Sequence, residues 1–237
     1  SYRKLAMRVL GRPLHTGGID SPRPASQRAA AFILTAAMLT TLAAPAFADI
    51  WRIEDGDITV KAGETKGTNK VSQGTTIDKV DTNTIITGTS DTNTVTIDTS
   101  KGNVDVTFDD LNIDASSRNE AAMSVTGSGN TTIKLDGDNH LTGGNGDTYG
   151  GDGIASTGSL TISGGETDSL TAQGGSGENG GDGITSSGSL TISGGTVTAT
   201  GGNSTGIVGS GGSGIHSGGD VTISGGTVTA TGGDRKS

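Results

Sequence analysis

The chain has 237 residues, of which 43 are Gly, 3% are aromatic and none is Cys. So few large side chains exclude a conventional globular core, and the absence of Cys excludes stabilisation by disulfides. The 16 Lys and Arg residues against 25 Asp and Glu give a net charge of −9. This balance argues against nucleic acid or an anionic lipid surface as a partner.

Residues 1–48 are predicted to be a signal peptide with an upstream extension. A basic start at Arg28 precedes the apolar run "AAAFILTAAMLTTLAA", which is too short to span a bilayer, and Ala46-Phe47-Ala48 forms a small-x-small cleavage site. We expect cleavage after Ala48 and a mature chain that is secreted or held at a bacterial cell surface. The alternative is a membrane anchor or a buried helix. The mature chain carries 10 Lys and Arg against 24 Asp and Glu, a charge near −14.

Residues 49–94 are predicted to form an N-terminal cap or irregular β segment. Apolar residues from Trp51 to Val60 are followed by a polar stretch rich in Lys and Thr that shows no repeat. A stack of β-coils needs such a cover over its open end.

Residues 95–237 are predicted to form a parallel β-helix (a β-solenoid). The segment "GSLTISGGTVTATGG" at 188–202 returns as "GDVTISGGTVTATGG" at 219–233. Aligned strand cores at spacings of 29, 27, 30 and 31 residues predict five coils of about 30 residues, each with three short strands. The cores are Val104/Val106, Ile133/Leu135, Leu160/Ile162, Leu190/Ile192 and Val221/Ile223. A β-sandwich is the rival fold. Because the sequence stops within a repeat, we expect a truncated C-terminus.

Alternation within each strand predicts which side chains are buried. Leu190 and Ile192 are expected to point inward and Thr191 outward, since side chains alternate faces along a strand. The Gly194-Gly195 pair is expected to turn the chain between strands, because glycine adopts positive φ without strain.

Six aspartates are candidate calcium ligands. An offset of 29 residues places Asp109 over Asp138, and an offset of 30 places Asp152 over Asp182. Carboxylates stacked in this way repel one another unless they splay into water or share a cation, and calcium prefers oxygen ligands. Solvated turn aspartates are the alternative reading. The full candidate set is Asp109, Asp110, Asp136, Asp138, Asp152 and Asp182.

A threonine array is expected on the outer surface, where Thr196, Thr198 and Thr200 lie beside their equivalents in the next repeat. Such an array resembles that of ice-binding solenoids. We expect the preceding repeat to break the array, because Asp168, Ser169 and Leu170 fall in the corresponding region.

Catalysis is not expected. Many β-helix proteins cleave polysaccharides. Residues 103–234, however, contain only two Lys or Arg residues, Arg118 and Lys134, and only two histidines, His140 and His216. A lyase needs a base flanked by cations that hold the substrate, and an Asp beside Gly or Asn is more often part of a turn.

The repeats "GDGIASTGSLTISGG" and "GDGITSSGSLTISGGTVTATGG", with "TTIKLDGDNHLTGG" after a signal peptide, resemble a family of secreted clostridial-type β-helix carbohydrate-binding domains. The resemblance covers residues 82–233. It implies a right-handed β-helix, calcium sites, and binding of plant cell-wall or acidic polysaccharide at the cell surface. No individual sugar-binding residue follows from it. The alternative functions are a non-catalytic structural stalk or adhesin repeat and, as a minor alternative, ice binding.

Overall fold

The computed structural model describes residues 49–236, and these residues form an almost purely β structure. One short 3-10 helix, η1 (Ile53–Asp55), interrupts the strands near the start. The strands are β1 (Ile50–Arg52), β2 (Ile58–Ala62), β3 (Asn69–Gln73), β4 (Thr76–Asp81), β5 (Thr84–Ser90), β6 (Val95–Asp98), β7 (Val104–Asp114), β8 (Met123–Thr126), β9 (Thr131–Asp136), β10 (Asp138–Thr142), β11 (Ile154–Ser156), β12 (Leu160–Ser163), β13 (Ser169–Gln173), β14 (Ile184–Ser186), β15 (Leu190–Ile192), β16 (Thr196–Thr200), β17 (Ile215–Ser217), β18 (Val221–Ile223) and β19 (Thr227–Thr231).

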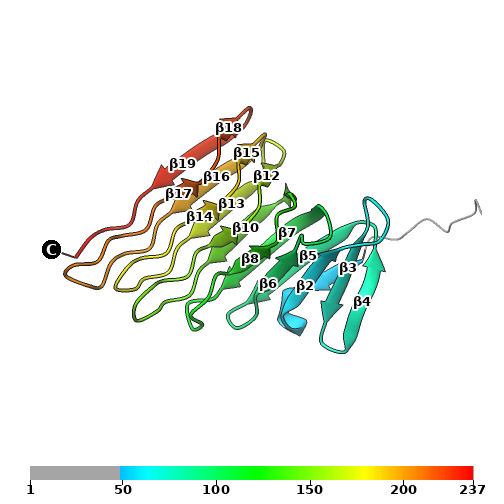
Figure 1. Cartoon of the computed structure of the whole chain (residues 1–237), viewed down its shortest axis with the longest axis horizontal. Helices are drawn as coiled ribbons and strands as arrows, with labels where there is room; N and C mark the ends of the chain where they lie inside the picture. Colours follow the sequence, from blue (N-terminus) through cyan, green and yellow to red (C-terminus); the bar gives the residue numbers. More distant parts are fainter. Residues whose placement is uncertain (1–48, 237) are drawn as a thin grey trace, which may run out of the picture. The chain divides into compact units, whose positions relative to one another are not determined.

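The strands wind into a parallel β-solenoid of about five coils (Figure 1). Three strands make up each later coil, and every strand pairs in parallel with its counterpart in the next coil, as in the β11–β14–β17 series. One sheet has eight strands in the order β17-β14-β11-β8-β6-β2-β3-β4, and the other has eleven. The long strand β7 pairs with both β9 and β10, so it takes the place of two strands of the next coil. The parallel pairing excludes the rival β-sandwich.

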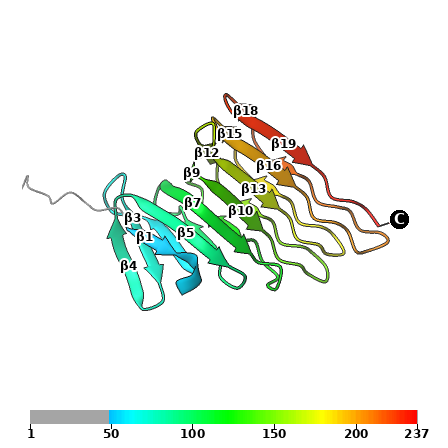
Figure 2. The ribbon, with the colours of Figure 1, turned by 180° about the vertical axis from the view of Figure 1, so that it is seen from behind.

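Residues 49–94 add a hairpin to the first coil. Strand β2 pairs in parallel with β6 on one side and antiparallel with β3 on the other, and β3 pairs antiparallel with β4. In the other sheet, β1 and β5 continue the parallel stack beside β7 (Figure 2). The connection between β2 and β3 therefore projects at the corner where the chain turns from β6 into β7.

The core is a thin stack of aliphatic side chains, as the alternation predicts. Ile133, Ile162 and Ile192 lie in register on successive coils and are fully buried, whereas Thr191 is only partly buried on the outer face. In the last coil, Val221 and Ile223 are 49% and 53% exposed, because no further coil packs on them within the described residues. Burial of each layer thus depends on the layer above it.

The predicted alignment of the first coils is wrong by two residues. Val106, rather than Val104, lies beside Ile133, and Ile133 lies beside Ile162 rather than Leu160. A shift of two keeps the same side chains facing inward, so the hydrophobic pattern alone does not distinguish the two registers. Buried Thr131 takes the place expected for an aliphatic residue.

Glycines serve two different purposes in the coils. Gly195 and its counterpart Gly226 have φ of 79°, and these residues make the turns between strands. In the long connections, Gly175, Gly181 and Gly202 instead lie on facing segments, where the N–H of Gly181 donates to Gly175 O at 2.9 Å and that of Gly202 to Gly181 O at 2.7 Å. A Cβ at any of these three positions would collide with a facing backbone carbonyl. At these three positions glycine is required because it has no side chain, not because it adopts a positive φ.

The predicted signal peptide and its alternative, residues 1–48, lie outside the described residues. Within the part of the chain that the structure describes, no helix has the length and apolar character needed to cross a membrane.

Candidate functional site

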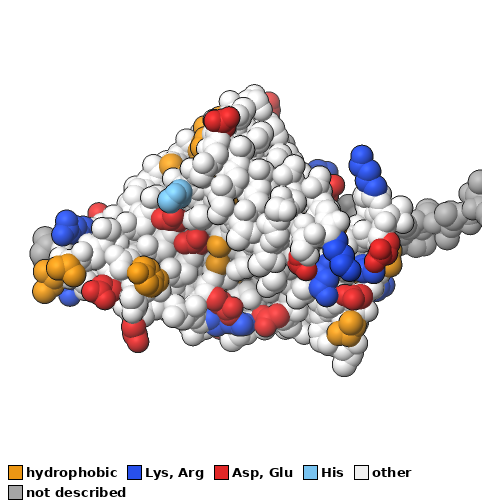
Figure 3. Space-filling view, in the orientation of Figure 1, with side chains coloured by type: hydrophobic (Ala, Val, Ile, Leu, Met, Phe, Trp, Pro, Cys, Tyr) orange, Lys and Arg blue, Asp and Glu red, His pale blue; other side chains and the backbone are white. Residues whose placement is uncertain are grey.

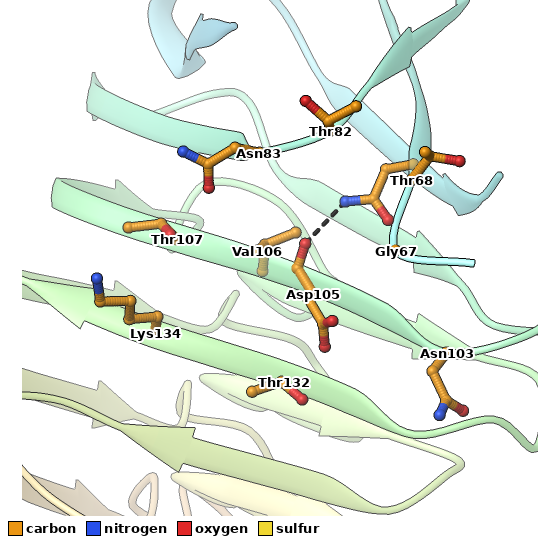
Figure 4. Close-up of a pocket in the computed structure, with 11 residues that line it drawn as sticks. Gly67, Thr68, Thr82, Asn83, Asn103, Asp105, Val106, Thr107, Thr132 and Lys134 are labelled. Carbon is orange, nitrogen blue, oxygen red and sulfur yellow. Dashed lines mark hydrogen bonds between the residues drawn. The ribbon is translucent and has the colours of Figure 1, made fainter. Parts of the chain in front are cut away.

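Three adjoining hollows lie at the corner between the two sheets, next to the β2–β3 connection. The first, of about 210 Å³, lies over β7 and β9 (Figure 4). The second, of about 380 Å³, shares Thr68, Asn103 and Asp105 with the first, and the third, of about 150 Å³, shares Glu64 and Lys101 with the second. We call the three together the corner groove. The first hollow is lined by Gly67, Thr68, Asn69, Thr82, Asn83, Asn103, Asp105, Val106, Thr107, Thr132 and Lys134.

The wall of the corner groove is fixed by one buried amide. Asn69, in β3, is only 6% exposed. Its Nδ2 donates to Thr84 Oγ1 at 2.9 Å and to the carbonyl of Asp105 at 2.7 Å. These bonds tie the hairpin to β5 and β7, and the connection before it is closed by a bond from Gly63 N to Thr68 O at 2.8 Å. The polar side chains of the groove therefore stand on a rigid support.

Most of the side chains that line the corner groove are polar. Asn83 and Asn103 contribute amides, Thr68 and Thr132 contribute hydroxyls, and Val106 is the apolar residue of the first hollow. Hydroxyl and amide groups of this kind exchange hydrogen bonds with polyhydroxylated molecules, and they offer little to an apolar ligand.

Several lysines surround the corner groove, and two of them are neutralised. Lys70 lies 2.7 Å from Glu64 and Lys61 lies 3.3 Å from Asp78. The hydrogen bond from Lys70 lowers the pKa of Glu64, and the charge of Lys101 lowers it further. Lys101 thus makes the electrostatic potential in the groove more positive.

The first group of predicted metal ligands comes together in different pairs from those expected. Asp109 lies beside Asp136 rather than Asp138, as a consequence of the two-residue shift. Asp138 instead donates its backbone N–H to Asp110 Oδ1 at 2.9 Å and accepts Ser169 Oγ at 2.7 Å. Partial burial, and then the charges of Asp136 and Asp110, raise the pKa of Asp109.

The second predicted pair is adjacent, as the 30-residue offset indicates. Asp152 Oδ1 accepts the backbone N–H of Asp182 at 2.8 Å, and Asp182 Oδ1 accepts that of Ser213 at 2.6 Å. Asp182 Oδ2 also accepts Thr185 Oγ1 at 3.0 Å and lies 3.4 Å from His216 Nδ1. Burial raises the pKa of Asp152.

These aspartates belong to a wider pattern in which a side-chain oxygen accepts the backbone N–H of the next coil. Asn145, Asn179 and Asn203 make the same bond to residues 31 positions later, at 2.8, 3.3 and 2.8 Å. Because neutral Asn serves as well as Asp, the role is that of a hydrogen-bond acceptor rather than a charge. Within the described residues, no group of three or more His, Cys, Asp or Glu side chains is arranged to hold a metal ion. Asp152 Oδ1 and both carboxylate oxygens of Asp182 already accept hydrogen bonds from protein groups, and calcium ligation by these two residues stays a prediction.

Comparison with protein-family models, with curated proteins and with solved structures finds no match. The resemblance to carbohydrate-binding β-helix domains therefore stays a prediction from the repeats.

The coil that precedes the threonine array continues it at one position of three, Thr171. Ser169 and Thr171 lie in register with Thr196 and Thr198, while Leu170 points inward beside Val197. The preceding coil therefore interrupts the array, as expected, but with Ser169 and Gln173 beside Thr196 and Thr200 rather than with Asp168 and Leu170. Tyr149, in the connection between β10 and β11, is 68% exposed.

The sequence pattern alone does not point to the residues of the corner groove. Asn69, Asn83 and Asn103 are separated by 14 and 20 residues, which matches no repeat period. The available signal was the concentration of lysines between residues 61 and 101, in a chain whose later repeats have almost none.

Proposed function

We propose that the chain is a non-catalytic, secreted or cell-surface module that binds polysaccharide, and that the corner groove is the contact site. The observation that carries the proposal is the lining of the groove: amide, hydroxyl, carboxylate and ammonium groups on a support fixed by Asn69. A polysaccharide presents hydroxyls along an extended chain, and adjoining hollows that turn around a corner fit a polymer segment better than a compact small molecule.

No aromatic side chain lines the corner groove, and this limits the affinity that we expect. Trp51 is 7% exposed and Phe108 is fully buried, so neither can stack on a sugar ring, and Tyr149 lies in a distant loop. Hydrogen bonds to water-exposed groups contribute only about 0.5–1.5 kcal/mol each. We therefore expect weak contacts that accumulate along a polymer.

The test is a pair of matched bulky substitutions. Thr132 and Thr191 occupy equivalent outward positions, since both are in register with Thr161, but only Thr132 lines the corner groove. Thr132→Trp should weaken polysaccharide binding about tenfold or more on a glycan array and in isothermal titration, while Thr191→Trp leaves it unchanged. Equal binding by both variants would show that the groove is not the site.

The second candidate function is a structural stalk or adhesin repeat. It is favoured by the way the aspartates and asparagines bond one coil to the next, which uses polar groups for stability rather than for a ligand. A wild-type chain that binds no glycan, with a cooperative thermal transition, would support the stalk.

A further inference from the structure

In the long connections after β10, β13 and β16, three asparagines each hold one residue of the next coil through a pair of hydrogen bonds. Asn145 Oδ1 accepts the backbone N–H of Ser176 at 2.8 Å, and the N–H of the following residue, Gly146, donates to the carbonyl of Ser176 at 2.9 Å. We call this arrangement an asparagine clamp. The other two clamps join Asn179 and Gly180 to Ser210, at 3.3 and 2.9 Å, and Asn203 and Ser204 to Asp234, at 2.8 Å for both bonds.

Two of these clamps contain the dipeptide Asn-Gly, the sequence that most readily loses its side-chain amide without an enzyme. The backbone nitrogen of the glycine gives up its proton and forms a bond to Cγ of the asparagine, while the Cγ–Nδ2 bond breaks and ammonia leaves. Glycine favours this step because it has no Cβ to hinder the approach of its nitrogen to the side chain. Water then opens the resulting succinimide ring at either carbonyl, which leaves aspartate or isoaspartate. The two pairs are Asn145-Gly146 and Asn179-Gly180.

A closed clamp opposes this reaction, because it occupies both reacting groups. The glycine N–H donates to a carbonyl of the next coil, and the side-chain oxygen of the asparagine accepts the N–H of the same residue. Turning the side-chain amide toward the glycine nitrogen breaks both bonds, and each polar group left buried without a partner costs about 1–3 kcal/mol. Succinimide formation therefore requires local opening of the coil that carries the serine.

The two Asn-Gly clamps differ in the residue that closes them. Ser176 is half-buried, and the residue after it, Gly177, pairs with Ser204 of the following coil. Ser210 is exposed, and its nitrogen lies 3.3 Å from Asn179 Oδ1, against 2.8 Å for the corresponding distance in the other clamp. The hydrogen bond that closes the clamp on Asn179 is therefore the weaker one.

Residues 205–209, which we call the bulge, lie directly before Ser210 and fill the place that Glu178 alone fills in the preceding coil. Ile207 and Val208, within the bulge, are 78% and 81% exposed. Apolar side chains project from the surface at this end of the stacked connections (Figure 3). Because its largest side chains lie in water, the bulge gains little from packing and opens more readily than the segments beside it.

We propose that Asn179-Gly180 is a site of spontaneous deamidation whose rate is set by opening of the bulge, and that Asn145-Gly146 is protected while the chain is folded. The two products act differently on the clamp. Aspartate at position 179 keeps the acceptor oxygen, as Asp152 does for the N–H of Asp182. Isoaspartate lengthens the backbone by one carbon, moves the glycine N–H away from the carbonyl of Ser210, and so releases the connection.

The experiment incubates the folded chain, and the same chain in urea, at mildly alkaline pH and follows both by peptide mapping with mass spectrometry. Conversion of the amide to an acid raises the peptide mass, and an isoaspartate-specific methyltransferase measures the share of isoaspartate. In the folded chain, position 179 should convert about fivefold or more faster than position 145, the ratio expected when one hydrogen bond of a clamp is weaker. In urea the two positions should convert at similar rates, both faster than in the folded chain.

Three variants test the cause, and circular dichroism confirms that each is folded. Replacing residues 205–209 by a single glutamate, as in the preceding coil, should lower the rate at position 179 to that at position 145. The matched control Val208→Ser keeps the length of the bulge and should leave the rate unchanged. Asn179→Asp reproduces the aspartate product and should melt as the wild type does, since the acceptor oxygen remains.

Several results would overturn the inference. These are no conversion at position 179 in the folded chain, conversion at position 145 that is equally fast or faster, or a rate at position 145 that is the same in urea as in the folded chain. An unchanged rate at position 179 in the shortened variant would show that the bulge does not control the site. If the shortened variant does not fold, the comparison of the folded wild type with the wild type in urea still decides.

Discussion

Truncation of a single inward side chain tests the stacked core. Ile192 is fully buried between Ile162 and Ile223 of the neighbouring coils. Ile192→Ala removes three carbon groups, worth about 0.8 kcal/mol each on transfer from water, and leaves a cavity that a tightly stacked rung can fill only in part. We expect the free energy of unfolding to fall by about 3–4 kcal/mol, a large share of the typical 5–15 kcal/mol of a domain.

The control is the neighbouring outward residue. Thr191→Ala removes a partly exposed side chain and should cost less than about 1 kcal/mol. A further comparison is Ile223→Ala, which should cost about half as much as Ile192→Ala, because Ile223 is 53% exposed. The charged substitutions Ile192→Asp and Thr191→Asp should differ in the same direction, with cooperative folding lost only in the first.

Urea denaturation followed by circular dichroism measures all of these variants. The midpoint shift should rank Ile192→Ala above Ile223→Ala and both above Thr191→Ala, with an unchanged denaturant dependence. Equal destabilisation by Ile192→Ala and Thr191→Ala would refute the assignment of the inner and outer faces.

Two further predictions concern the connections between coils. Gly202→Ala should destabilise the chain by about 2 kcal/mol or more, because the new Cβ would collide with the carbonyl of Gly175. The control is Gly232→Ala, whose Cβ would meet its nearest atom at an ordinary 3.6 Å and should be tolerated. Equal thermal melts of the two variants would contradict the close packing. Asp152→Asn should raise the melting temperature at neutral pH, because burial raises the pKa of Asp152 in the folded chain and a neutral amide escapes that penalty while it still accepts the Asp182 N–H. Because the pKa of Asp152 is higher in the folded chain than in the unfolded chain, the free energy of unfolding of the wild type falls as the pH rises from the unfolded pKa through the folded pKa. Below the unfolded pKa, about pH 4, the carboxyl is neutral in both states, so the gain of the Asp152→Asn variant should vanish there. Calcium ligation by Asp152 makes the opposite prediction, a calcium-dependent rise in wild-type melting temperature that the variant loses, and calcium titration of both proteins separates the two.

The sequence by itself determined the solenoid, its period and the inward face of its strands. These follow from local patterns: the side-chain period of two within a strand, and near-identical segments about 30 residues apart, of which Ile162, Ile192 and Ile223 are an example. A chain with so few large side chains can bury such short strands only by stacking them.

Tertiary structure decided the register of the first coils and the grouping of polar residues. A two-residue slip leaves the inward pattern unchanged, so nothing local distinguished Asp136 from Asp138 as the partner of Asp109. The corner groove depends on the antiparallel hairpin β3–β4, which breaks the repeat and which Asn69 ties to β7. Side chains brought together by one non-repeating connection leave no periodic trace in the sequence, because their proximity exists only after the coils have stacked.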